Sequence, residues 1–183
     1  EISTELKDKT VYTVFSKPVG RDQFVIGKFL GSFMVGAVTI IILAIGVMIL
    51  LRLQEGCFTP MLIKGLVLFL GEALIIASIA IFFSTFLTDT FAGLSTLVVF
   101  LVGRCTHLLP ILSDKSSNKA FKFIAKLLYY IFPDLNHLNL MSPLSHKIDV
   151  PGDYVIASLA YAIVYSAVFV CLSIIIFRQK DFE

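Results

Sequence analysis

The feature that most constrains this chain is a run of 23 residues without a charged side chain, from Phe29 to Leu51. A helix needs about 20 mostly apolar residues to cross the hydrocarbon core of a bilayer. The apolar residues are continuous and do not alternate with polar ones, which predicts a helix and not a barrel strand. Because 57% of the 183 residues are apolar and 15% are charged, we expect a membrane protein and not a soluble enzyme.

Four apolar segments predict an all-α, polytopic membrane protein. We expect transmembrane helices at about residues 23–51, 61–87, 91–109 and 154–177, with a tight turn at Thr88-Asp89-Thr90 between the second and the third. These spans make a transmembrane domain of residues 23–183, which follows a polar region at 1–22. Four spans place both chain ends on one side of the membrane. Seven lysines and arginines lie on that side and eight on the other, so the charge count does not decide the orientation.

Two shorter helices are predicted outside the spans. Residues 3–16 interleave apolar and charged side chains, which indicates an amphipathic helix that ends before Pro18, since the residue before a proline disfavours helix. Residues 117–132 have a helical period, with an apolar stripe on one face and lysines on another. This segment is too short and too polar to span, so we expect it to lie in the plane of the interface. The stripe is Phe121, Ile124, Leu127, Leu128 and Ile131, and the lysines are Lys119, Lys122 and Lys126.

One carboxylate lies well inside a predicted span. An ionised side chain at the bilayer centre costs about 2.5–3.5 kcal/mol on insertion scales, so Glu72 is expected to face protein or water. In one interpretation, Glu72 lines a substrate route or pairs across the bundle with Arg104, in the last turns of the third span. In the other interpretation, Glu72 lies near the end of its own span, close to Lys64, and reaches headgroups or water.

The last span carries small residues and tyrosines at helical spacing. Ser158, Ala162 and Ser166 recur every four residues, and Tyr161 and Tyr165 form a neighbouring stripe. Small residues let helices approach closely in membranes, and a buried tyrosine needs a hydrogen-bond partner. We interpret the pattern as a packing seam, and a ligand site is the alternative.

The sequence contains none of the signatures of hydrolytic or metal-dependent enzymes that we sought. It has no HExxH, no GxSxG and no P-loop, so a non-catalytic chain is predicted. Three widely separated cysteines favour neither a zinc site nor a disulfide framework. His137, His146 and Asp149 have the chemistry to bind a metal, but their spacing matches no ligand pattern and a polar loop is the preferred interpretation. A net charge of +2 gives no indication of nucleic-acid binding.

Residues 16–31, with the sequence SKPVGRDQFVIGKFLG, resemble the membrane subunit of type 2 ABC exporters. The resemblance is to the branch grouped with permeases for multi-copper enzyme maturation. Gly20 stands where that family has a serine, and glycine also serves as a helix N-cap. Three later stretches are similar to the family's turn between two spans, its external segment and its C-terminal ending. These stretches are residues 84–87, 132–140 and 177–182.

The resemblance implies an architecture and partners for this chain. Family permeases have six spans and this chain matches the last four, so we expect two N-terminal spans to be missing from it. Both ends would lie in the cytoplasm, the interfacial helix outside, and the protein in the cell membrane, as a multi-pass protein of a bacterial cytoplasmic membrane. Two permease copies, or two homologous permeases, would assemble with two ATPase subunits. ATP and magnesium would bind those ATPase subunits, and this chain would hold no cofactor.

The resemblance also implies a function and a partner-binding site. The chain would move an unidentified substrate by alternating access, driven by the ATPase subunits; a membrane scaffold or assembly subunit without transport activity is the alternative. Residues 3–16 would dock in a groove of the ATPase as a coupling helix. The expected contacts are charged Glu5, Lys7, Asp8 and Lys9, apolar Leu6, Val14 and Phe15, and Lys17, Pro18 and Arg21 of the matched string.

Overall fold

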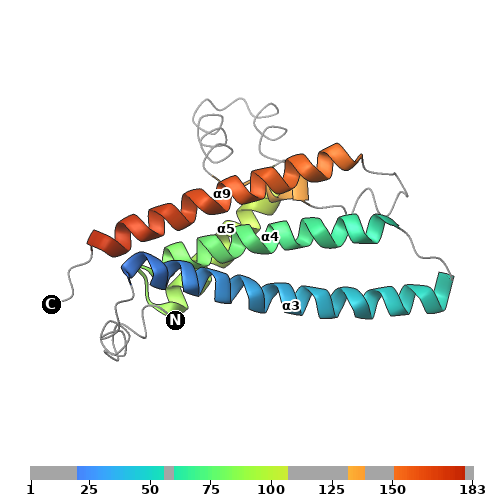
Figure 1. Cartoon of the computed structure of the whole chain (residues 1–183), viewed down its shortest axis with the longest axis horizontal. Coiled ribbons are helices and arrows are strands. Elements are labelled where there is room, and N and C mark those ends of the chain that lie inside the picture. The colour runs from blue at the N-terminus through green and yellow to red at the C-terminus, as the bar shows by residue number, and fades with distance from the viewer. Residues whose placement is uncertain (1–19, 56–59, 107–131, 139–150, 180–183) are drawn as a thin grey trace, which may run out of the picture.

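A computed structural model describes residues 20–55, 60–106, 132–138 and 151–179 (Figure 1). These ranges contain four α-helices, one 3-10 turn and no strand, so the predicted all-α class is confirmed. Helices that follow one another in sequence run in opposite directions, so α4 and α9 run parallel, and α3 begins at the end of the bundle where α9 ends (Figure 1). The elements are α3 (Arg21–Glu55), α4 (Pro60–Ser84), α5 (Asp89–Cys105), η1 (Leu135–Leu138) and α9 (Gly152–Gln179).

Helix α4 is the centre of the bundle. It packs against α9 most extensively and also contacts α3, α5 and η1. Leu68 and Ile75 of α4 are fully buried, in one cluster with Ala162 of α9 and with Leu135 and Leu138 of η1. The short η1 turn therefore packs beside the middle of α4, next to the C-terminal end of α5.

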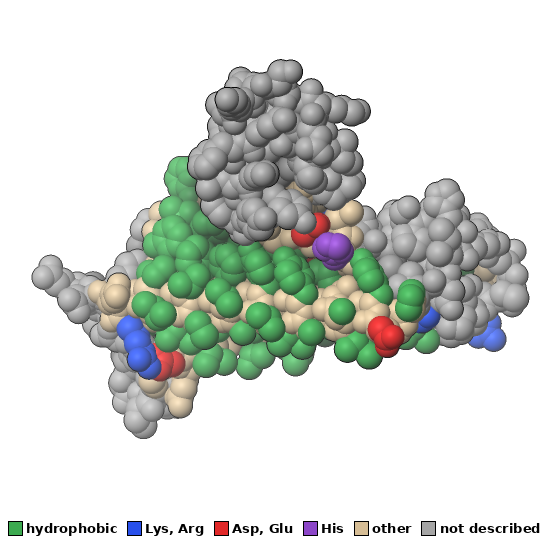
Figure 2. Space-filling view, turned by 90° about the horizontal axis from the view of Figure 1, so that it is seen from above, with side chains coloured by type: hydrophobic (Ala, Val, Ile, Leu, Met, Phe, Trp, Pro, Cys, Tyr) green, Lys and Arg blue, Asp and Glu red, His purple; other side chains and the backbone are tan. Residues whose placement is uncertain are grey.

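Among the described helices, three are long and apolar enough to cross a membrane: α3, α4 and α9. Helix α5 has 17 described helical residues, or about 25 Å at 1.5 Å per residue, and the predicted continuation of this span to residue 109 lies outside the described ranges. Many large apolar side chains are exposed on these helices. On the face seen in Figure 2, hydrophobic side chains cover the surface between charged groups toward its two ends. This pattern is expected when lipid and not water surrounds the bundle.

The turn between α4 and α5 lies earlier than the sequence predicts. The hydroxyl of Thr85 donates to the carbonyl of Phe82 at 2.7 Å, and such local bonds compete with helix continuation. Thr88 has an extended backbone, and its carbonyl accepts from the Ala92 amide at 2.8 Å. Thr88 is thus the N-cap of α5, and Asp89, which the prediction placed in the turn, is helical because an acid in the first turn complements the helix dipole.

The small residues of α9 lie where packing requires them. Ser158, Ala162 and Ser166 are all buried, and α9 makes its most extensive contacts with α4. The interpretation of this pattern as a packing seam therefore agrees with the structure. Both short amphipathic helices predicted from the sequence, at residues 3–16 and 117–132, lie outside the described residues apart from residue 132.

Candidate functional site

The start of α3 shows why the chain turns into a helix at this point. The Gly20 carbonyl accepts from the Phe24 amide at 3.2 Å, and the Gly20 amide donates to Gln23 Oε1 at 3.3 Å. A Gln that reaches back to the N-cap amide is one half of a capping box. Gly20 therefore acts as the N-cap, and α3 begins at Arg21.

An ion pair joins the start of α3 to the end of α9. The Nε of Arg178 donates to Oδ1 of Asp22 at 2.7 Å, and its Nη2 donates to Oδ2 of the same carboxylate. Two parallel bonds of this kind fix orientation as well as distance. Each charge also suits its place, since the acid is in the first turn of α3 and the base in the last turn of α9.

An apolar cluster lies next to this ion pair. The rings of Phe24 and Phe177 stack with centroids 5.7 Å apart and an interplanar angle of 17°. Phe177 and Val25 are fully buried and pack with Ile81 of α4, so three helices meet here. We call Asp22, Phe24, Phe177 and Arg178 the foot clamp.

A second ion pair lies inside the bundle, between α4 and α5. The Nη2 of Arg104 lies 2.7 Å from Oε1 of Glu72 and donates to Oε2 at 2.9 Å. Glu72 is only 3% exposed, so of the two interpretations the structure shows the pairing across the bundle. Although Oε1 is close to Arg104, it accepts no hydrogen bond of good geometry from the described residues.

The surroundings of Arg104 hold its side chain in place. Its guanidinium carbon lies 5.4 Å from the centroid of the Phe100 ring, at the distance of a cation–π contact. The neighbouring Gly103 packs so closely on the 132–138 segment that a Cβ there would lie 2.9 Å from the Pro133 carbonyl oxygen. The absence of a side chain at Gly103 therefore lets the end of α5, with Arg104, approach η1.

Asp134 organises the segment that leads into η1. Its Oδ1 accepts from the Asn136 amide at 3.0 Å and lies 3.1 Å from the Thr106 hydroxyl, whose single proton it shares with the Gly103 carbonyl at 2.8 Å. Its own amide donates to the Tyr161 hydroxyl at 3.1 Å, and its Oδ2 lies 3.4 Å from Nε2 of His137. Asp134 thus ties the end of α5 and η1 together through its carboxylate and binds α9 through its backbone amide.

The two predicted tyrosines belong to an aromatic row along α9. The rings of Tyr161 and Tyr165 have centroids 5.6 Å apart, and Tyr165 stacks on Phe169 at 5.2 Å. Phe169 meets Phe82 of α4 edge-on at 5.2 Å. The row runs from Tyr161, which binds Asp134, to Phe82 near the C-terminal end of α4.

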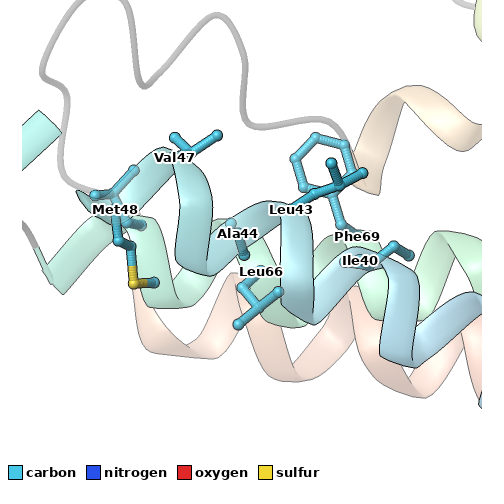
Figure 3. A pocket seen from close by; sticks show the side chains of 9 residues that line it. Ile40, Leu43, Ala44, Val47, Met48, Leu66 and Phe69 are labelled. Carbon is cyan, nitrogen blue, oxygen red and sulfur yellow. The ribbon is translucent and has the colours of Figure 1, made fainter. Parts of the chain in front are cut away.

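An apolar cavity of about 280 Å³ lies between α3 and α4 (Figure 3). Leu43, Val47 and Met48 of α3 line one side, and Leu66 and Phe69 of α4 line the other. The walls carry no charged side chain, so the cavity offers no polar recognition. It lies along the half of α3 farthest from the foot clamp.

Sequence reasoning did not single out several residues of these contacts. Neither Asp22 nor Arg178 is among the candidate site residues predicted from the sequence, although Arg178 lies in the C-terminal stretch 177–182. Thr106 and Asp134 received no role, although an aspartate directly after a proline, in a polar segment, is a known turn signal.

Other predicted residues cannot be placed by the structure. The expected ATPase contacts from Glu5 to Pro18 lie outside the described residues, and Arg21 lies in α3 without a described side chain. Three residues were considered for a metal site, His137, His146 and Asp149, and the structure describes only His137. The described residues contain no group of three side chains suited to a metal ion.

The comparison with known proteins gives one match. The family model described as ABC-2 family transporter protein matches residues 1–182, which is nearly the whole chain. No curated protein and no solved structure matches.

Proposed function

Since the chain belongs to the ABC-2 family of transporter proteins, and so is a permease subunit of an ABC transporter, we propose that it works as an exporter. Partner ATPase subunits would drive it between inward-open and outward-open states. They would bind the ATP and magnesium, and this chain would contribute the membrane path and the helix that receives their movement.

The observation that best supports a transport role is the buried ion pair of Glu72 and Arg104. Removing two charges from water is costly, and a buried pair often stabilises a fold no better than apolar residues would. Ionisable residues inside membrane proteins usually face the bundle interior or a water-filled route. Glu72 lies on the central helix, and its Oε1 is paired by charge with Arg104 at 2.7 Å but accepts no well-aligned hydrogen bond from the described residues. A carboxylate in that state can accept a hydrogen bond from a polar substrate that passes along the bundle.

The family and the string at residues 16–31, which leads into α3, support the proposed partners. We propose that residues 3–16 form the coupling helix, that Leu6, Val14 and Phe15 anchor it in the ATPase groove, and that its charged residues contact the rim. A second copy of this chain, or a homologous permease, would complete the membrane domain. Both ends of the segment would then lie in the cytoplasm of the cell, and residues 117–132 outside it.

Purification of the chain together with its ATPase subunits tests the proposal. Replacing two apolar anchors, Leu6→Asp with Phe15→Asp, is expected to abolish recovery of the ATPase, because a charged face does not fill an apolar groove. The control pair Glu5→Gln with Lys9→Gln keeps the apolar face and should retain most of the recovery. Undiminished recovery with the first pair would contradict the coupling role.

A membrane scaffold without transport activity is the alternative. A transported molecule stimulates ATP hydrolysis in a transporter complex, and it has no such effect on a scaffold. In proteoliposomes, ATP hydrolysis that responds to a panel of candidate substrates favours the permease. Hydrolysis that stays constant across the panel, with an intact complex, favours the scaffold.

A further inference from the structure

We propose that Asp22 and Arg178 are positioning residues for transport, which pass movement of the first turn of α3 directly to α9. The proposal rests on the proposed function, because it needs an ATPase subunit that moves the chain before Gly20. It goes further in naming the helix that receives the movement and the residues that pass it on.

The geometry of the ion pair suits the transmission of movement between two helices better than the stabilisation of the fold. The Arg178 side chain is 64% exposed and that of Asp22 is 36% exposed, and exposed ion pairs add little to folding stability. Two parallel hydrogen bonds nevertheless hold two groups in one orientation. The ion pair thereby links the first turn of α3 to the last turn of α9, although its two residues lie 156 positions apart in the sequence.

The aromatic part of the foot clamp makes the link stiff. Phe24 and Phe177 stack, and the fully buried Phe177 and Val25 pack with Ile81 of α4. Close-packed side chains transmit strain and do not absorb it gradually. The first turn of α3 therefore moves together with the end of α9, or this packing has to break.

Beyond the foot clamp, α3 packs along α4, its most extensive contact, but few of its side chains are buried there. Among its described side chains only Val25 and Ala37 are buried, and its far half borders the apolar cavity of about 280 Å³ beside α4. The tightest packing of α3 is thus at its first turn, where the fully buried Val25 and Phe177 meet, so a displacement of this turn is passed to α9 there. Helix α9 then carries it to α4, its most extensive contact, and α4 holds Glu72.

Distance measurements in the complex with its ATPase subunits test this proposal. After Cys57, Cys105 and Cys171 are replaced by serine, spin labels are attached through Leu97→Cys on α5 and Val168→Cys on α9. Both native side chains are about half exposed, and neither belongs to the foot clamp. The distance between the labels is measured without nucleotide and after trapping with ATP and vanadate. With the clamp intact, trapping is expected to shift the distance.

The variant Asp22→Asn removes the charge that holds Arg178. It is expected to abolish most of the nucleotide-dependent shift while the ATPase is recovered normally, and Asp22→Glu should restore the shift. A merely structural role would instead lower recovery or stability. The matched control is Asp153→Asn, the same change in the first turn of α9, which should leave the shift unchanged.

Two results would overturn the proposal: a full shift in Asp22→Asn with bound ATPase, or no shift between α5 and α9 with the clamp intact. If Asp22→Asn does not assemble, Arg178→Gln breaks the same contact from α9 and must abolish the shift. Failure of the unaltered chain to recover any ATPase contradicts the proposed function instead, so the two failures are distinguishable.

Discussion

Nη2 of Arg104 lies 2.7 Å from one carboxylate oxygen of Glu72 and 2.9 Å from the other, inside the bundle. The pair links the central helix α4 to α5 at a depth where Glu72 is almost fully buried. Because each charge offsets part of the cost of burying the other, the two residues act as one unit.

Loss of Arg104 should destabilise the bundle more than loss of the charge on Glu72. Removing one partner of a buried pair costs about 3–5 kcal/mol when both are fully buried. The Arg104 side chain is 27% exposed, so we expect roughly 2–3 kcal/mol for Arg104→Leu, after a discount for solvent screening. Unfolding in mixed detergent micelles measures this. Adding Glu72→Gln to Arg104→Leu should recover part of the loss, and a strictly additive double variant would contradict coupling between the two residues.

The variant Glu72→Gln should alter transport while the complex remains intact. The amide keeps the size of the side chain but removes the charge that Arg104 and a polar substrate would meet. We expect substrate-stimulated ATP hydrolysis in proteoliposomes to change, with normal recovery of the ATPase subunits. Unchanged hydrolysis and unchanged transport would rule out a role for this carboxylate on the substrate route.

Gly103 should tolerate no side chain. A Cβ there would lie 2.9 Å from the Pro133 carbonyl oxygen and 3.0–3.1 Å from Leu135 side-chain atoms, and overpacking typically costs about 1–3 kcal/mol. Gly103→Ala is therefore expected to lower the free energy of unfolding by about that amount. The control is Gly93→Ala on the same helix, where nothing lies within 4 Å. This change should be neutral or stabilising, because alanine favours helix over glycine by about 1 kcal/mol.

The hydroxyl of Thr106 should contribute measurably to stability. It donates to the Gly103 carbonyl at 2.8 Å and contacts Asp134 Oδ1 at 3.1 Å, and the residue is fully buried. Thr106→Val keeps the shape and removes the bonds, so a loss of about 1–2 kcal/mol is expected. Thr96→Val is the control, since its hydroxyl bonds only to the Ala92 carbonyl of its own helix. Equal losses of unfolding free energy in both variants would show that the contact between Thr106 and Asp134 adds nothing to stability.

The topology proposed for residues 117–132 can be tested in intact cells. In a chain without its native cysteines, Lys119→Cys and Lys126→Cys should react with a membrane-impermeant thiol reagent from outside. The lysines lie on the polar face of the predicted interfacial helix, which headgroups and water can reach. Labelling that requires cell lysis would reverse the proposed orientation of the whole chain.

Much of the architecture could be predicted from the order of residue types. Long uncharged runs require helices that satisfy their own backbone in lipid, and proline, glycine and threonine mark where those helices begin and end. The energetic cost of a carboxylate in hydrocarbon also singled out Glu72 and suggested Arg104 as its partner. These features depend on local composition and on the solvent, so they can be read without knowing which helices are neighbours.

Only the tertiary structure shows which helix is central and which distant residues meet. A membrane helix is apolar on all sides, and lipid tails are as apolar as leucine, so hydrophobicity does not distinguish a buried face from a lipid-facing one. That α4 is central, that Asp22 meets Arg178, and that Asp134 binds both Thr106 and Tyr161 all depend on shape and on the pairing of polar groups. Such pairing is decided between helices, by close packing and by the need of each buried polar atom for a partner.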